Sequence, residues 1–134
     1  MAHTYGEVLS PCFPDIFSCA RDPQQTTFVD AGSGYGALLV AAVTDYGCKH
    51  AIGIEKYKDK YHASLDLVSQ LPQDLQQRVI VVLQDINDTD FMPLLDRMSF
   101  QTLLFFCNNV AFNSGTIHRY TSSFTGMISS LQAA

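Results

Sequence analysis

The chain has 134 residues, a length typical of a single domain, and 47% of them are hydrophobic against 16% charged. This composition can fill a core and excludes a globally disordered chain. The net charge of −5 argues against strong direct binding to nucleic acid. The longest apolar run, Ala37 to Val43, is far shorter than the about 20 residues that span a bilayer, and the N-terminus shows no secretory signal. We therefore expect one soluble, intracellular domain over residues 1–134 that does not insert into membranes.

The cysteines and histidines give no sign of a metal centre. The chain contains no C-x-x-C pair, and its cysteines and histidines are not grouped at the spacing of metal ligands. We expect reduced and mostly buried thiols, and no bound metal. The four cysteines are Cys12, Cys19, Cys48 and Cys107.

Strand and helix patterns alternate along the chain. A leading loop over residues 1–25, with a short helix over 15–21, precedes four apolar runs that predict strands. These runs are Thr26–Asp30, His50–Ile54, Val79–Leu83 and Thr102–Cys107. Helical patterns follow them at Ala37–Tyr46, Lys58–Leu71, Met92–Met98 and, weakly, Thr116–Leu131. Because the strands are continuous apolar runs, the pattern predicts an α/β domain with a mostly parallel sheet covered on both faces.

The helix predicted at Lys58–Leu71 has an apolar and a polar side. Tyr61, Leu65 and Val68 recur at helical spacing and are expected to face the core. The basic and aromatic side chains around Lys60 are expected to form a solvated surface rather than a nucleic-acid contact.

Polar side chains follow each predicted strand at its carboxyl end. Three strands lead into Asp30, Glu55 and Asp85, and the fourth into Asn108 and Asn109. Right-handed crossovers bring these ends to one edge of a parallel sheet, where ligands bind. Loop solubility would explain any one acid taken singly. Because carboxylates are costly to bury without partners, their repeated placement predicts a site that recognises hydroxyls and amines.

The loop after the first strand carries Gly32, Gly34 and Gly36 directly behind Asp30. The glycines let the backbone approach a ligand closely, as in the G-x-G-x-x-G loop of dinucleotide enzymes, although the spacing here is G-x-G-x-G. An acid in front of the loop would repel a phosphate but suits the ammonium group of an amino acid. The pattern therefore favours S-adenosylmethionine over a nicotinamide cofactor.

Two further acids fit the rest of that cofactor. Glu55 ends the second strand about 20 positions after the loop, where a carboxylate pairs with the two ribose hydroxyls. Asp85, past the third strand, is placed to accept a hydrogen bond from the adenine amine, and Ile86 to flank the ring. A helix cap or turn residue is the alternative interpretation of Asp85.

Four segments, in matching order, resemble the disruptor-of-telomeric-silencing histone lysine methyltransferases. The first is the opening Tyr5-Gly-Glu7, and the second is Phe28-Val-Asp-Ala-Gly-Ser-Gly-Tyr-Gly36. The others are Cys48-Lys-His-Ala-Ile-Gly-Ile-Glu-Lys56 and Asn108-Asn-Val-Ala-Phe112. Many methyltransferases share the glycine loop, whereas the first and last segments are more specific to this family.

The resemblance implies a Rossmann-like class I methyltransferase fold, a three-layer sandwich that binds S-adenosylmethionine and releases S-adenosylhomocysteine. It implies methylation of a lysine on the nucleosome, with a protein substrate such as a histone, and a nuclear location; a different substrate would fit the cytoplasm. Asn108, beside the methyl group, and Phe106, in the lysine channel, are the implied catalytic residues. The implied cofactor-binding residues are Tyr5, Glu7, Asp30, Gly32, Gly34, Gly36, Glu55, Lys56, Asp85, Ile86 and Asn108.

The chain departs from the family pattern in two places. Val8 stands where a threonine is usual after Tyr-Gly-Glu, which removes a hydroxyl near the cofactor. Four strands are recognisable where a class I methyltransferase has seven, so we expect the last strands to be absent and an open sheet edge that invites self-association. Two alternatives stay open: a non-catalytic cofactor-binding or interaction module, and a methyltransferase of the same fold with another substrate.

Overall fold

The computed structural model describes residues 13–18, 20–86, 93, 102–107 and 128–129. The helices are α1 (Phe13–Phe17), the 3-10 helix η3 (Pro23–Gln25), α2 (Ala37–Thr44), α3 (Lys58–Ser69) and α4 (Gln73–Gln76). The strands are β1 (Thr26–Ala31), β2 (His50–Glu55), β3 (Val79–Leu83), β4 (Thr102–Cys107) and β5 (Ile128–Ser129). The first four strands match the predicted ones within a residue. The first helix begins at Phe13 rather than Asp15, inside the segment expected to be a loop, and α4 was not predicted.

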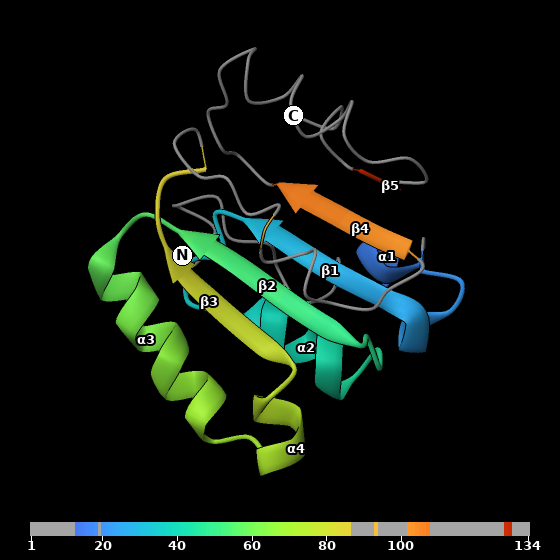
Figure 1. The fold of residues 1–134 in the computed structure, drawn as a ribbon, viewed down its shortest axis with the longest axis horizontal. Helices are drawn as coiled ribbons and strands as arrows, with labels where there is room; N and C mark the ends of the chain where they lie inside the picture. The colour runs from blue at the N-terminus through green and yellow to red at the C-terminus, as the bar shows by residue number, and fades with distance from the viewer. Residues whose placement is uncertain (1–12, 19, 87–92, 94–101, 108–127, 130–134) are drawn as a thin grey trace.

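The strands form one sheet in the order β3-β2-β1-β4-β5, and every neighbouring pair is parallel. The arrows of β1 to β4 accordingly point the same way in Figure 1. The sequence order reverses at β1, between β2 and β4, which is the switch point where parallel sheets bind ligands. The predicted α/β fold with a parallel sheet is confirmed.

The expectation at the outer edge of β4 is wrong in part. Ile128 and Ser129, predicted within a weak helix, pair in parallel with Leu104 and Phe105 as β5. The free N–H and C=O groups of an edge strand are strong partners for a short β-branched segment, and they outweigh a weak helical pattern. This edge is therefore not fully open. The helix predicted over 92–98 lies outside the described residues except at residue 93.

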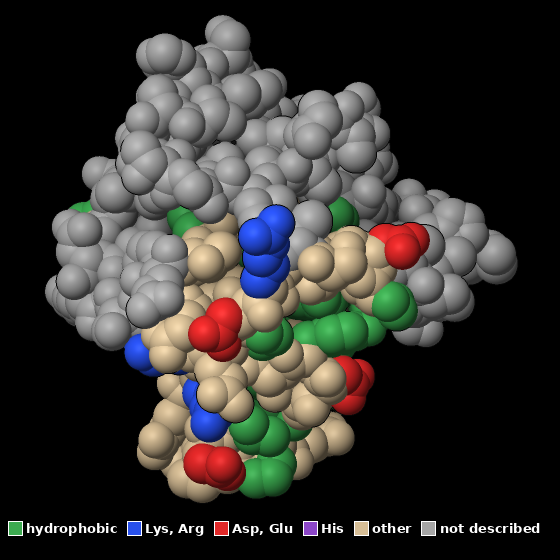
Figure 2. Space-filling model, turned by 90° about the vertical axis from the view of Figure 1, so that its right-hand side faces the viewer, with side chains coloured by type: hydrophobic (Ala, Val, Ile, Leu, Met, Phe, Trp, Pro, Cys, Tyr) green, Lys and Arg blue, Asp and Glu red, His purple; other side chains and the backbone are tan. Residues whose placement is uncertain are grey.

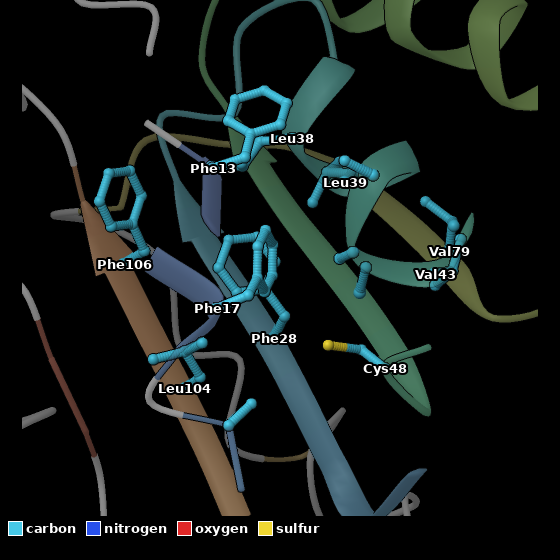
Figure 3. Packing of buried hydrophobic residues seen from close by; sticks show 14 of the residues in the cluster. Phe13, Phe17, Phe28, Leu38, Leu39, Val43, Cys48, Val79, Leu104 and Phe106 are labelled. Atoms are coloured by element: carbon cyan, nitrogen blue, oxygen red, sulfur yellow. The ribbon is translucent and has the colours of Figure 1, made fainter. Parts of the chain in front are cut away.

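The helices α1, α2 and α3 contribute to a single core on one face of the sheet. Phe17 of α1 contacts Phe28 of β1 with ring centroids 4.9 Å apart, and Phe28 stacks in turn on Phe106 of β4 at 6.5 Å. Leu39 of α2, labelled in Figure 3, belongs to the same cluster. Val68 of α3 belongs to it as well. Figure 1 shows α1 and α2 behind the sheet. This packing fixes the strands whose carboxyl ends carry the predicted site.

The opposite face of the sheet is buried as well. Val29, Ile52 and Phe105 alternate with the core residues along β1, β2 and β4, and each is 0% exposed. Burial on both faces explains why the strands are continuous apolar runs in the sequence.

The inward side of α3 differs in part from the prediction, since Val68 is buried as expected but Leu65 is not. Lys60, Ser64 and Val68 are its buried residues, whereas Leu65 is 39% exposed. Lys60 is therefore not part of a solvated surface. One reason is the contact at Ser64, because the backbone of Gly36 packs so closely against this residue that Gly36 could not carry a Cβ. The side of α3 that faces the glycine loop therefore carries Lys60 and Ser64.

Charges on the described surface are mixed in sign. Figure 2 shows acidic and basic side chains interspersed on one face rather than gathered into a basic patch. Within the described ranges, no helix has the length and apolar character to cross a membrane.

Candidate functional site

The glycine loop is pinned to the end of β2. The backbone N–H groups of Gly32 and Ser33 both donate to the carbonyl of Ile54, at 2.7 Å and 3.1 Å. Asp30, just before the loop, lies in register with Gly53 of β2 and Phe106 of β4. The loop, Asp30 and the end of β2 are thus brought together at the carboxyl edge of the sheet, as the sequence predicts.

Two glycines at this edge are required by the space around them. Gly36 has φ of +91°, and a Cβ on it would lie 2.8 Å from the Cβ of Ser64. A Cβ on Gly53 would collide with the side chains of Leu39 and Ser33. Real Cβ atoms do not approach so closely, so the loop can pack onto β2 and α3 only through glycine.

Glu55 holds two turns together through its carboxylate. Its Oε1 accepts a hydrogen bond from the N–H of Gly34 at 2.6 Å, and its Oε2 accepts one from the N–H of Tyr57 at 2.8 Å. The side chain is only 4% exposed. A carboxylate offers about four acceptor positions, so each oxygen keeps capacity for a further donor such as a hydroxyl.

Asp30 is a second buried carboxyl at this edge, with 4% of its surface exposed. Burial, and then the nearby negative charge of Glu55, raise the pKa of Asp30 well above its usual range. Two carboxyls in so little water favour a cation between or beside them. The arrangement suits an ammonium or sulfonium group better than a phosphate.

The remaining predicted cofactor residues lie at the ends of β2 and β3. Lys56 is exposed next to Glu55, and its ammonium lies 5.2 Å from the centre of the Tyr57 ring. The N–H of Gln84 donates to the carbonyl of Glu55 at 2.9 Å and so brings the segment after β3 to the same edge. Asp85 there is half-buried, and Ile86 is 4% exposed.

Of the two predicted catalytic residues, only Phe106 can be placed. It is 7% exposed and its ring packs on Phe28 in the core. Its place in a lysine channel stays a prediction. Asn108, Tyr5 and Glu7 lie outside the described residues, so their assigned roles also stay predictions.

Three side chains beside the glycine loop were missed in the sequence. Tyr35 lies inside the loop, Tyr57 lies two positions after Glu55, and the ammonium of Lys60 lies 5.5 Å and 5.3 Å from the centres of the Tyr35 and Tyr57 rings. The sequence contained a signal for this side of α3, because Lys60 and Ser64 are four positions apart and therefore lie on the same side of the helix. The apolar spacing of Tyr61 and Leu65 on the neighbouring side hid it.

The described thiol is part of the core. Cys48 is 0% exposed and uncrosslinked, and burial raises its pKa to about 11. Over the part of the chain that the structure describes, acidic, cysteine and histidine side chains form no group of three or more that could hold a metal ion.

Solved structures similar to this fold include methyltransferases. An RNA methyltransferase from Salinibacter ruber in complex with S-adenosylhomocysteine aligns with a TM-score of 0.63 at 15% identity, over 91% of this chain and 71% of that one. A methyltransferase from Geobacter sulfurreducens, also with S-adenosylhomocysteine, aligns with a TM-score of 0.69 at 18% identity, over 93% and 48%. The chain therefore has the Rossmann-like class I methyltransferase fold.

Sequence relatives narrow the family. The chain is 32% identical over 53 residues to a histone-lysine N-methyltransferase, H3 lysine-79 specific, from Candida glabrata. This match spans 40% of the chain and 8% of that protein. A model of the family described as histone methylation protein DOT1 matches residues 1–130. The resemblance seen in the sequence is thus confirmed, and the chain belongs to the DOT1 family of histone methylation proteins.

Proposed function

We propose that the carboxyl edge of β1 and β2 binds S-adenosylmethionine, and that the protein transfers its methyl group to a lysine of a histone. The observation that carries the proposal is the Glu55 carboxylate, which two backbone amides fix at this edge while its oxygens keep room for hydroxyl donors. Membership of the DOT1 family supports the reaction and the histone substrate. A nuclear location follows from that substrate.

The residues present fit the cofactor in charge and in hydrogen-bonding capacity. Glu55 would accept hydrogen bonds from the ribose hydroxyls, since the N–H groups of Gly34 and Tyr57 already hold its carboxylate in one orientation. Asp30 would face the ammonium, which favours the charged carboxylate and opposes the burial that raises its pKa. Asp85 and Ile86 would contact the adenine. Gly32 and Gly34 carry no side chain, so the cofactor could approach the backbone of the loop closely.

The chemistry asks mainly for positioning. S-adenosylmethionine supplies, when bound, an already activated methyl group. The protein then needs to align the acceptor amine and keep water out. An apolar channel that includes Phe106 would lower the pKa of a lysine amine by desolvation. Asn108 would orient the reacting groups by a hydrogen bond without changing its own charge.

Calorimetric titration with S-adenosylhomocysteine tests the binding step. We expect binding by the wild-type chain, and a dissociation constant about 10- to 100-fold higher in Glu55→Gln, because a hydrogen bond to a charged group contributes about 1.5–3 kcal/mol. Gly32→Arg should abolish binding. The matched control is Asp66→Asn, which neutralises an exposed carboxyl on α3. A folded wild-type chain that does not bind, or a Glu55→Gln chain that binds normally, would contradict the proposal.

Methyl transfer is tested with isotopically labelled S-adenosylmethionine and reconstituted nucleosomes, free histones or RNA as acceptors. Label in a histone lysine that disappears in Glu55→Gln is the expected result. Label in RNA alone would replace the substrate proposed here. Cofactor binding without transfer to any acceptor would favour the non-catalytic module.

A further inference from the structure

A buried cation lies beside the proposed cofactor site. Lys60, in the first turn of α3, is 8% exposed, although a lysine is among the residues least often buried. Its ammonium lies within 6 Å of the centres of two aromatic rings, those of Tyr35 and Tyr57. Cations at this range are attracted to the negative face of the ring, more strongly where water is excluded. The two rings therefore offset part of the cost of burying the charge.

Tyr35, Tyr57 and Lys60 are linked by contacts that surround Glu55. Tyr35 directly follows Gly34, whose N–H donates to Oε1 of Glu55. Tyr57 uses its own N–H to bind Oε2 of the same carboxylate. Lys60 then joins the rings of Tyr35 and Tyr57. The two backbone amides that orient Glu55 are thus each adjacent to, or part of, a residue whose ring contacts Lys60.

A second contact between the same elements reinforces these contacts. Ser64 lies one helical turn after Lys60, and the backbone of Gly36 packs against its Cβ. Two successive positions on one side of α3 therefore hold the glycine loop, one by charge and one by small size. The tyrosine rings themselves stay accessible, at 40% exposed for Tyr35 and 53% for Tyr57. Their burial is thus not what orders the loop.

We propose that Lys60 is a positioning residue of the cofactor site: its ammonium, which lies over the rings of both Tyr35 and Tyr57, fixes the two turns whose amides orient the Glu55 carboxylate. The inference rests on the proposed function for its consequence, which is tighter cofactor binding. Its structural part, the ordering of the amides of Gly34 and Tyr57, holds in the protein without cofactor and can be measured there.

The first experiment measures amide hydrogen exchange by NMR in the cofactor-free protein. Lys60→Met keeps the length of the side chain and removes its charge, and Lys60→Arg keeps a cation that can lie over a ring. We expect exchange at Gly34 and Tyr57 to be about 5- to 30-fold faster in Lys60→Met, with most of the protection restored in Lys60→Arg. The amides of Val29 and Ile52 in the sheet are the internal reference and should not change.

The second experiment changes a ring instead of the cation. Tyr35→Phe keeps the aromatic face, whereas Tyr35→Leu removes it. Both variants and both Lys60 variants are titrated with S-adenosylhomocysteine. We expect Tyr35→Leu and Lys60→Met to raise the dissociation constant by about 5- to 30-fold, and Tyr35→Phe to stay close to wild type.

The outcomes separate this inference from the proposed function. Unchanged exchange at Gly34 and Tyr57 in both Lys60→Met and Tyr35→Leu would overturn the role of Lys60, whether or not the cofactor binds. Faster exchange spread evenly over the sheet would also overturn it, since a loss of overall stability would then be the cause. A third outcome combines faster exchange at Gly34 and Tyr57 in the variants with a wild-type chain that does not bind S-adenosylhomocysteine. This outcome would uphold the role of Lys60 and contradict the proposed function.

Discussion

The two turns at the ends of α2 use the same backbone device in opposite surroundings. The turn that enters α2 at the carboxyl edge of the sheet contains Gly36 with φ of +91°, and the turn that leaves it contains Gly47 with φ of +71°. A Cβ on Gly36 would meet Ser64 at 2.8 Å, whereas a Cβ on Gly47 would meet nothing within 4 Å. One glycine serves close packing as well as chain direction, and the other serves chain direction alone.

Buried polar groups at the two edges of the sheet differ in their hydrogen bonding. At the carboxyl edge, both oxygens of Glu55 accept backbone hydrogen bonds. At the amino edge, Thr27 and His50 lie in register on β1 and β2, and Thr27 Oγ1 and His50 Nδ1 are buried with no hydrogen-bond partner among the described residues. Burial and the positive charges of Lys49 and Arg78 lower the pKa of His50. Ser33 Oγ in the glycine loop is also buried with no hydrogen-bond partner among the described residues, so unpartnered groups occur at both edges. The difference is that the carboxyl edge holds a buried carboxylate fixed by two backbone amides, which is a pattern expected where a sheet edge binds a ligand.

Substitution of Gly36 and of Gly47 should give the largest difference in stability between the two turns. We expect Gly36→Ala to lower the free energy of unfolding by about 2–4 kcal/mol, since a left-handed alanine adds backbone strain of about 1–2 kcal/mol and the clash with Ser64 adds to it. Gly47→Ala should cost about 1–2 kcal/mol, from strain alone. Urea unfolding of both variants measures the difference. Equal losses would mean that the contact with Ser64 relaxes freely.

Asp30→Asn tests the contribution of a buried carboxyl at the carboxyl edge to cofactor binding. The substitution keeps the shape and removes the charge, so we expect S-adenosylhomocysteine to bind about 10- to 100-fold more weakly through the lost interaction with its ammonium, about 1.5–3 kcal/mol. Asp45→Asn, an exposed carboxyl in the turn that leaves α2, is the matched control. Normal binding by Asp30→Asn would remove Asp30 from the site.

The same variant has a defined dependence on pH. The pKa of Asp30 is raised by burial and by the charge of Glu55, so the folded chain holds this proton more tightly than the unfolded chain. The stabilisation is complete below the unfolded pKa of about 4 and is lost as the pH rises through the raised value. Asp30→Asn does not titrate there. Its free energy of unfolding, relative to wild type without cofactor, should therefore increase as the pH rises from 4 to 8.

The sequence was sufficient for the parts of the fold that depend on local pattern. The four long strands are continuous and mostly apolar, and their carboxyl ends could be aligned because the strands of a parallel sheet run in one direction. The glycine loop and Glu55 were found for the same reason, since both lie at strand ends. The position of β5 could not be found locally. Its two residues form a strand only because β4 offers free hydrogen-bonding groups.

The inward side of α3 was predicted correctly only at Val68, because a three-dimensional constraint outweighs the hydrophobic spacing in the rest of the helix. Tyr61 and Leu65 follow helical periodicity, but the bare backbone of Gly36 selects Ser64 as the inward residue and places Lys60 beside it. Periodicity weighs side chains by polarity and does not detect that two elements approach through a glycine and a serine. A buried lysine over two tyrosine rings likewise becomes visible only when the rings are placed.

Thr27→Val tests the amino edge, where the smallest effect is expected and its sign is the informative part. The Thr27 hydroxyl is buried with no hydrogen-bond partner in the described part of the chain, so replacing it with a methyl group should raise the free energy of unfolding by about 1 kcal/mol. The neighbouring Thr26 is equally buried, but its Oγ1 donates to the carbonyl of Asp22 at 2.8 Å. Thr26→Val should therefore lower stability by about the same amount. If Thr27→Val is destabilising instead, its hydroxyl has a partner in solution, most simply a water shared with His50, and the amino edge is as organised as the carboxyl edge.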